Sequence, residues 1–224
     1  MSTVKPPYAM PFIRMELCVL SVIDGNLSVL LGRRQQEPCK GHWALPGGVL
    51  RIDLDANLAR AAQRVAVERI GTELPYLRQQ CCIGGPGRDP RSQWSLSVVY
   101  RALTTIENLQ TKPGKRLEAL RWCDVELAMK DTSLAFDHHQ IIATAVSDLR
   151  LEVSRLDLPF DYLPAEFTLG ELQENCELLL GRKLDKSSFR RRLDDRQCVQ
   201  SVEGAFKRGA NRPAQLYRQS VKQI

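Results

Sequence analysis

The stretch 45–71 combines residue types that could hold a phosphate group. It opens with a proline followed by Gly47 and Gly48, and it continues into a segment whose apolar residues recur at helical spacing. Paired glycines let the backbone approach a ligand closely, and a helix that starts nearby presents a fixed face to the same pocket. The pattern predicts a glycine loop and an amphipathic helix, with Asp55 or Asn57 as its N-cap and a glycine as its end.

This stretch resembles the signature of the Nudix hydrolases, in which a glycine loop precedes a helix that carries one arginine and several glutamates. Arg64 and Glu68 fall on the arginine and on one of the helix glutamates. Val65 and Arg69 stand where the signature has two further glutamates. An insertion also lengthens the loop, so that the loop glutamate of the signature has no clear counterpart.

The departures from the signature concern the residues that would hold a metal ion. Cleavage of a pyrophosphate needs divalent cations, and Mg²⁺ needs several carboxylate oxygens in octahedral positions. Glu68 alone, with Asp53 and Asp55 as the nearest acids, cannot supply them, and Arg69 adds a positive charge. We therefore predict no catalytic residues, no metal site and a pocket that binds a phosphorylated ligand without cleaving it. For Arg64 and Glu68 alone, an ordinary helix ion pair is the alternative.

Arginines elsewhere in the chain could reach the same pocket. Arg34 ends an expected strand shortly before the glycine loop, with an exposed strand end as the alternative. The later loop GGPGRDPR carries Arg88 and Arg91, which could clamp a phosphate while Asp89 holds one of them in place. A plain surface turn is the alternative for this loop. The expected ligand contacts are Arg34, Gly47, Gly48, Arg51, Asp53, Glu68, Arg88, Asp89 and Arg91.

The composition is that of a globular chain. Its 224 residues are 43% hydrophobic, enough to form one large core or two modest ones. No apolar run approaches the ~18 to 20 residues of a membrane span, and the N-terminus lacks the pattern of a signal peptide, so we expect a cytoplasmic protein. The 7 cysteines are odd in number and show no C-x-x-C spacing, which favours reduced thiols.

Positive charge is concentrated toward the C-terminus. Residues 181–224 hold 12 Lys or Arg against 4 Asp or Glu, whereas residues 1–180 hold 20 against 22. Such asymmetry is typical of a chain that binds a polyanion through one part, although a solvated charged face gives the same composition. The pattern of helices and strands must decide between the two.

Residues 1–153 are expected to form one domain with a mixed sheet. Period-two runs joined by short turns predict strands, and two longer runs at helical spacing predict helices. The resemblance implies a Nudix-like α/β/α sandwich. The segment 154–164 contains two prolines among polar residues and marks the boundary to a second domain, 154–224. The expected elements are strands at 15–23, 27–33, 80–83, 94–103 and 117–123, and helices at 58–71 and 136–153.

The tail follows the order of a winged helix-turn-helix. A capping box from Thr168 to Glu171 opens one helix, Gly181 closes it, and Asp185 caps a second, basic helix. A basic hairpin follows, with turn-forming glycines at 204 and 209. In this class the second helix enters the major groove of DNA and the wing touches the backbone. A small helical domain with a solvated basic face is the alternative. The residues expected to contact DNA are Lys186, Ser187, Ser188, Arg190, Arg191, Arg192 and Arg212.

Over nearly its whole length the chain resembles the Nudix-related transcriptional regulators of NAD metabolism. The resemblance rests on the degenerate signature, the insertion after LPGG, the GRDPR loop, FDHHQI at the start of the linking helix, and FTLGELQENCELLLGRKLDKSSFRRRL in the tail. It implies an α+β repressor whose N-terminal domain binds ADP-ribose as effector, without a required cofactor. It further implies a homodimer whose winged helices bind palindromic operators of NAD-synthesis and salvage genes.

Two other classes remain open. An active ADP-ribose pyrophosphatase with an accessory C-terminal domain would need the carboxylates that Val65 and Arg69 have replaced, although Glu68, Asp53 and Asp55 could hold one weakly bound metal. A protein-binding adaptor with a basic surface would show no saturable, salt-dependent affinity for duplex DNA.

Overall fold

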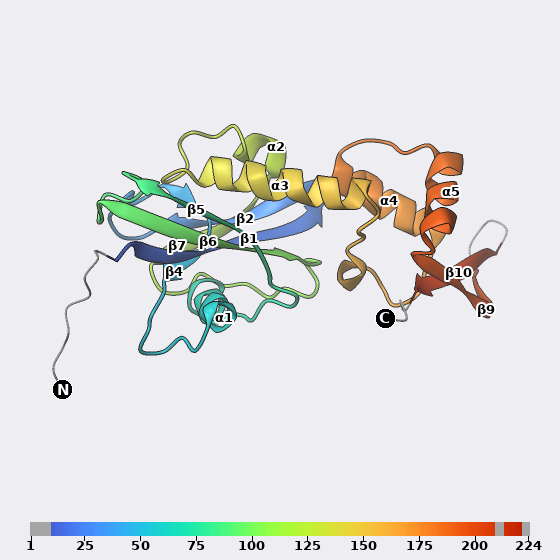
Figure 1. The fold of residues 1–224 in the computed structure, drawn as a ribbon, viewed down its shortest axis with the longest axis horizontal. Coiled ribbons are helices and arrows are strands. Elements are labelled where there is room, and N and C mark those ends of the chain that lie inside the picture. Colours follow the sequence, from blue (N-terminus) through green and yellow to red (C-terminus); the bar gives the residue numbers. More distant parts are fainter. Residues whose placement is uncertain (1–9, 209–212, 221–224) are drawn as a thin grey trace.

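The structure is a computed structural model that describes residues 10–208 and 213–220. Figure 1 shows an elongated molecule with a sheet flanked by helices at one end and a smaller domain at the other. The long helix α3 (His138–Ser154) runs from the first part to the second. The expected architecture, a mixed-sheet sandwich followed by a domain of two helices and a hairpin, is confirmed.

A mixed sheet of 7 strands forms the N-terminal domain within the described residues. The order of its main path is β3-β2-β1-β6-β5, and β4 and β7 pair with β1 and β2. The first and sixth strands are parallel, whereas the first and second form the expected antiparallel hairpin. The strands are β1 (Phe12–Ile23), β2 (Asn26–Arg34), β3 (Trp43–Ala44), β4 (Gly47–Val49), β5 (Arg78–Pro86), β6 (Trp94–Leu103) and β7 (Leu117–Asp124).

Alternation along β1 supplies a core on each face of the sheet. Met15, Leu17 and Val19 pack with α1 (Leu58–Ile70), while Cys18 and Leu20 belong to the cluster on the side of α3. A short helix, α2 (Val125–Ala128), covers the α3 face as well. The sandwich therefore places α1 on one face, directly after the glycine loop, and α3 on the other.

The C-terminal domain has the helices and hairpin of a winged helix. Thr168 and Glu171 form the expected capping box at the start of α4 (Leu169–Leu180), which ends at Gly181 in the left-handed conformation. Asp185 caps α5 (Lys186–Arg196) through the backbone N–H of Ser188. The small sheet has the order β8-β10-β9, formed by β8 (Phe167–Thr168), β9 (Val199–Lys207) and β10 (Ala214–Gln219). A single 3-10 turn, η1 (Phe160–Tyr162), lies in the connecting segment.

The hydrophobic core continues from one domain into the other. Leu172 of α4 and Phe189 and Leu193 of α5 belong to the same buried cluster as Ile142 and Leu149 of α3. The position of α5 is thus tied through apolar packing to the helix that begins in the sheet domain.

The structure differs from the expected elements in a few places. β5 continues through Gly84 and Gly85, which pair with Leu96 and Ser95 of β6. Position 84 holds glycine because the Trp94 ring lies where its side chain would be. Gly204 lies inside β9 with φ +69° rather than at a turn. The short elements β3, β4, α2, η1 and β8 were not expected, and the expected turn at 209–211 lies outside the described residues.

Among the described residues, Cys18, Cys39, Cys81, Cys82, Cys123 and Cys176 are free thiols. Among the residues that the structure describes, no helix is both long and apolar enough to cross a membrane.

Candidate functional site

A pocket beside the glycine loop is lined by five arginines. It also includes the backbone of Gly47 and Gly48 and residues near the end of β2 and the start of β7. Among the described residues, Glu37 supplies the one carboxylate of its lining. We call this site the arginine pocket, and its arginines are Arg14, Arg34, Arg69, Arg91 and Arg116.

Arg69 comes from the last turn of α1 and is buried. Its Nε donates to the carbonyl of Gly47 at 2.8 Å, and its Nη1 donates to the carbonyl of Lys115 at 3.1 Å. The two hydrogen bonds fix the guanidinium beneath the glycine loop, where a Cβ on Gly48 would lie 3.4 Å from Nη2. The glycines therefore let the loop backbone approach this arginine closely.

Arg14, on β1, is held by a buried carboxylate. Its Nε donates to Oε1 of Glu16 at 2.7 Å, and both side chains are buried. The second oxygen, Oε2, has no hydrogen-bond partner among the described residues and lies where a side chain at position 47 would be. Gly47 is thus required for the close packing of the loop on Glu16.

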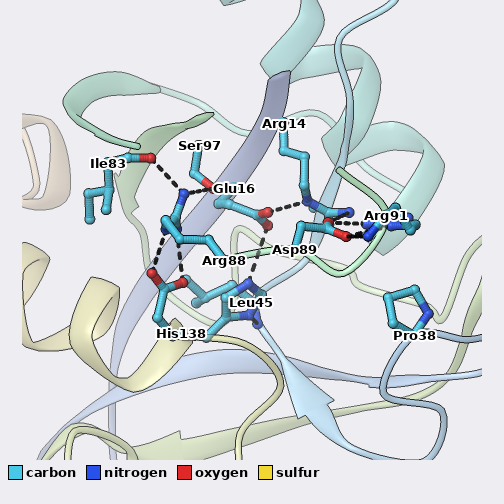
Figure 2. Close-up of polar contacts among 12 residues, drawn as sticks. Arg14, Glu16, Pro38, Leu45, Ile83, Arg88, Asp89, Arg91, Ser97 and His138 are labelled. Atoms are coloured by element: carbon cyan, nitrogen blue, oxygen red, sulfur yellow. Dashed lines mark hydrogen bonds and ion pairs between the residues drawn. The ribbon is translucent and has the colours of Figure 1, made fainter. Parts of the chain in front are cut away.

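Asp89 holds Arg91 at the edge of the pocket, as Figure 2 shows. Nε and Nη2 of Arg91 donate to its two oxygens at 2.8 and 2.5 Å, and the guanidinium lies 4.9 Å from the ring centre of Phe12. Burial raises the pKa of Asp89, but the bonds from Arg91 outweigh it and the pKa lies below its usual range. Asp89 stays ionised and fixes the arginine in place.

Arg88 does not line the arginine pocket, although it follows Gly87 in the same loop. It donates to both oxygens of Asp137 at 2.6 and 2.8 Å, and its Nη1 donates to the carbonyl of Ile83 and to Oγ of Ser97. With its donors engaged in this way, Arg88 joins the loop to the start of α3 (Figure 2). The structure therefore shows Arg88 in a positioning role, and its contact with a ligand stays a prediction.

Two residues at and just before the start of α3 contact residues that line the pocket. Nδ1 of buried His138 accepts a hydrogen bond of 2.8 Å from the backbone N–H of Leu45, and burial lowers the pKa of His138 to about 4. The imidazole is therefore neutral at pH ~7 and acts as an acceptor that anchors the glycine loop. The ring of Phe136 lies 5.5 Å from the guanidinium of Arg14 and 5.0 Å from that of Arg34.

The arginine pocket carries more positive charge than its partners neutralise. Burial, and then the neighbouring charge of Arg14, lowers the pKa of Arg34. Burial also lowers the pKa of Arg69, with Arg116 adding to the effect and Glu68 opposing it. Guanidinium groups that repel one another in a partly desolvated site gain from an anion placed among them. The site is therefore suited to a phosphate or diphosphate.

Besides Arg88 and Asp89, three expected ligand contacts lie outside the pocket lining: Arg51, Asp53 and Glu68. Arg51 and Asp53 pair with each other on the exposed insertion, at 2.6 Å. Oε2 of Glu68, on α1, lies 3.4 Å from Nη1 of Arg64 and 3.7 Å from Nη1 of Arg69. Arg64 is bound mainly by Asp55, whose pKa this hydrogen bonding lowers. Arg64 therefore ties the insertion to α1.

Arg14 and Arg116 are not among the contacts that we expected from the sequence, and Arg69 was expected only as a positive charge that could meet a phosphate directly. Arg69 occupies a position of the signature normally held by a glutamate, which is a usable signal. Arg14 reaches the site through the pairing of β1 with β4, and Arg116 lies in the segment before β7 with φ +66°. Neither has a local sequence signal, because its place depends on strand pairing.

The donors near the glycine loop do not fit a divalent cation of the kind that Nudix enzymes use. Val65 is apolar and fully buried, and Arg69 places a guanidinium one helical turn further on. Within the described ranges, no three His, Cys, Asp or Glu side chains come together as metal ligands. Hard cations need several oxygen ligands, so the charge that faces the ligand here comes from arginine.

A second candidate site is the outer face of α5. Phe189 and Leu193 are its buried residues, and a residue two positions from either lies ~200° around the helix. Ser187 and Arg191 are therefore the most outward of the expected DNA contacts, and both are exposed. Arg190 is also exposed, on one flank of the same face. The arrangement suits a recognition helix.

Other expected DNA contacts have different surroundings. Arg192 donates to the carbonyl of Ser154 at the end of α3, which turns it toward the sheet domain. Lys207, a basic wing residue that is not among the expected contacts, pairs with Glu171 of α4. Arg212 lies outside the described residues. Lys186 and Ser188 lie in the first turn of α5, the first exposed and the second half-buried.

A cavity of about 510 Å³ lies between the domains, away from the arginine pocket. Arg150 of α3 crosses its edge, since its Nη2 lies 2.6 Å from Oε1 of Glu126 and its Nε donates to the carbonyl of Leu179 at 3.4 Å. The cavity combines carboxylates and cations without a buried unpaired group among its lining residues. We therefore regard it as the groove at an interdomain joint.

Comparison with known families places both halves of the chain. The NUDIX domain family matches residues 13–145, and the NrtR DNA-binding winged helix domain matches residues 159–219. The fold and the two sites therefore define a protein in which a Nudix domain precedes a winged helix.

Individual relatives agree along nearly the whole chain. The ADPR-responsive transcriptional repressor NtrR of Acinetobacter baylyi is 38% identical over 96% of this chain and 84% of its own length. The crystal structure of Shewanella oneidensis NrtR with a 27mer DNA superposes with a TM-score of 0.75, at 31% identity, over 93% of each chain. The Nudix domain of the same Shewanella protein with ADP-ribose superposes with a TM-score of 0.59, at 29% identity, over 66% of this chain and 94% of that one. The chain belongs to the NrtR family of Nudix-related transcriptional regulators.

Proposed function

We propose that the protein is a DNA-binding transcriptional repressor of NAD-synthesis and salvage genes, controlled by ADP-ribose in the arginine pocket. The observation that carries the proposal is this pocket, lined by five arginines, in a Nudix fold joined through α3 to a winged helix. The effector responsiveness of the Acinetobacter relative supports the same pairing of ligand and function. The proposed effector and DNA-binding domains are residues 1–153 and 154–224.

The diphosphate of ADP-ribose would lie among the arginines. Arg69 and Arg91 are already fixed by hydrogen bonds, so their charges need no rearrangement to meet the phosphates. The backbone of Gly47 and Gly48 would close one side. Because arginine supplies the positive charge, the protein needs no metal or other cofactor to bind this ligand.

DNA recognition would use the exposed face of α5. Arg191 and Ser187 face outward and would read base edges, while Lys186 and Arg190 would contact phosphates from the flanks. A two-fold homodimer would present two such helices to a palindromic operator. Since its partner is the chromosome, we place the protein in the cytoplasm.

The same pocket argues against an active hydrolase. Pyrophosphate cleavage in this fold would need carboxylates at positions 65 and 69, which hold valine and arginine. If purified protein with excess Mg²⁺ or Mn²⁺ hydrolysed ADP-ribose at enzyme-like rates, the alternative of an ADP-ribose pyrophosphatase would replace this proposal.

The deciding experiment measures the affinity for DNA with and without ADP-ribose. Full-length protein is bound to a duplex that it has selected from random-sequence DNA, and the Kd is measured by fluorescence anisotropy with and without ADP-ribose. Linkage requires that ADP-ribose and DNA change each other's affinity by the same factor, with a coupling free energy typically ~1 to 3 kcal/mol. Equal Kd values with and without ADP-ribose would show that the two sites are uncoupled and would overturn effector control.

A further inference from the structure

Two positions of α1 lie directly beneath the glycine loop. A Cβ placed on Gly48 would lie 2.8 Å from Cγ2 of Val65 and 3.4 Å from Nη2 of Arg69. These are the two positions at which the Nudix signature has glutamates, and here one is apolar and the other is a cation. The point where the fold would present carboxylates to a metal ion therefore presents a guanidinium.

Burial and hydrogen bonds hold the Arg69 side chain in this position. Its side chain is buried, and two backbone carbonyls, of Gly47 and Lys115, accept hydrogen bonds from Nε and Nη1. Nη2 has no hydrogen-bond acceptor among the described residues, and the side chain lines the arginine pocket. A buried guanidinium with an unused donor beside a pocket is a fixed anion contact.

We infer that Arg69 takes the place of the divalent cation, so that the pocket binds its diphosphate ligand in the metal-free form and Mg²⁺ opposes binding. The inference rests on the proposed function, in which ADP-ribose is the ligand. A Mg²⁺ ion on the diphosphate removes negative charge from the ligand and brings a second cation against Arg69. Two cations brought together in a desolvated site repel each other. Only the fraction of the ligand without bound Mg²⁺ is therefore competent to bind.

The test is a calorimetric titration of full-length protein with ADP-ribose, in EDTA and at rising MgCl₂, with ionic strength held constant by NaCl. We expect the apparent Kd to rise in proportion to the inverse of the uncomplexed fraction, which is measured separately for ADP-ribose and Mg²⁺ without protein. The Kd expressed in free ADP-ribose should stay constant across the series.

A variant with glutamates at both signature positions should reverse the effect of Mg²⁺ on ADP-ribose binding. In the double variant Val65→Glu, Arg69→Glu, added Mg²⁺ should strengthen ADP-ribose binding instead of weakening it, because carboxylates now face the pocket. The control double variant Ala59→Glu, Arg60→Glu makes the same charge change at two exposed positions of α1, so it should retain the opposition by Mg²⁺. Thermal melting shows whether each variant is folded, and the titration of the unaltered protein decides the matter even when the double variant is not.

The possible failures are distinguishable. An apparent Kd that is equal in EDTA and in MgCl₂, or lower in MgCl₂, would overturn the role of Arg69 while leaving ADP-ribose as the effector. Absence of ADP-ribose binding in every buffer would overturn the proposed effector, and the inference with it.

Discussion

The arginines of the pocket and those of α5 are positioned in opposite ways. Arg69 and Arg91 each have two fixed hydrogen bonds in the folded protein. Arg190 and Arg191 are exposed and have no hydrogen bond or ion pair among the described residues. A small effector gains affinity when its contacts are preorganised, because side-chain entropy is lost at folding rather than at binding. DNA contacts from long exposed side chains lose that entropy on binding and gain adaptability.

The helix α3 connects the two kinds of site. Asp137 and His138 at its start contact the loops around the pocket, through Arg88 and the N–H of Leu45. Ser154, at its end, accepts a hydrogen bond from Arg192 of α5. A ligand that shifts the start of α3 can therefore change the placement of the recognition helix without touching DNA.

Replacing Arg88, next to the pocket, by Met should change the free energy of unfolding far more than replacing an exposed arginine of α5. The change at Arg88 removes the partner of half-buried Asp137, where burial raises the pKa and the arginine more than offsets it. The unpaired carboxylate and the freed carbonyl of Ile83 should lower the free energy of unfolding by about 3 kcal/mol. Urea denaturation measures this. The matched change Arg190→Met on α5 should stay within about 0.5 kcal/mol; equal losses for the two variants would refute the distinction.

The same contrast explains how far the sequence could predict the structure. Helix ends were predictable because their signals are local, as with Asn57, Gly71 and the capping box at Thr168. The choice between Arg88 and Arg91 was not, because both lie in one loop with similar neighbours. The partner that turns Arg88 away from the pocket, Asp137, comes 49 positions later in the chain.

The lining of the arginine pocket shows the same limit. Its glycines and Arg34 are close in sequence to the signature and were predictable from it. Arg14 and Arg116 arrive through the register of β1 and the path before β7, which sequence periodicity does not fix. On α5, helical periodicity alone separates outward Arg191 from Phe189, whereas the contact of Arg192 with α3 depends on how the two domains pack.

The next largest effect should be a loss of stability in mild acid. Burial lowers the pKa of His138 to about 4, whereas an unfolded chain has a histidine pKa of ~6.5. The unfolded state therefore takes up this proton first, so the protein loses stability as pH falls below ~6.5, by about 2 kcal/mol at pH ~5. Carboxylates with lowered pKa, such as Asp89, add their loss below that window.

The acid effect can be assigned to one side chain. His138→Asn keeps an acceptor for the N–H of Leu45 and should flatten the dependence of unfolding free energy on pH between ~5 and ~7. Gln140→Asn, at an exposed position of the same helix turn, removes no titrating group and should leave the slope unchanged. An unaltered slope in the His138 variant would show that another group titrates in this window.

Replacement of the outward arginine of α5 should affect DNA affinity and leave folding intact. Arg191→Ala should cost about 1 to 3 kcal/mol at the selected operator and relax its sequence preference. Arg190→Ala should weaken binding to all sequences alike and reduce the salt slope by about one unit. Anisotropy titrations on operator and random duplexes at several salt concentrations separate the two. The reverse assignment would follow if Arg190→Ala were the change that relaxed the preference.

The smallest effect is expected at the interdomain joint, and it should appear only in the coupling between the sites. Arg150 joins Glu126 of the sheet domain to the carbonyl of Leu179 at the end of α4, and half of the Glu126 side chain is exposed, so its ion pair adds little to stability. Arg150→Met should leave the separate Kd values for ADP-ribose and DNA nearly unchanged. Their coupling should change by about 0.5 to 2 kcal/mol, because the link between α3 and α4 transmits the displacement. Lys130→Met, on the same domain but away from this joint, is the matched control. If both variants retained full coupling, transmission would run through the apolar packing of α3 on α4 and α5 instead.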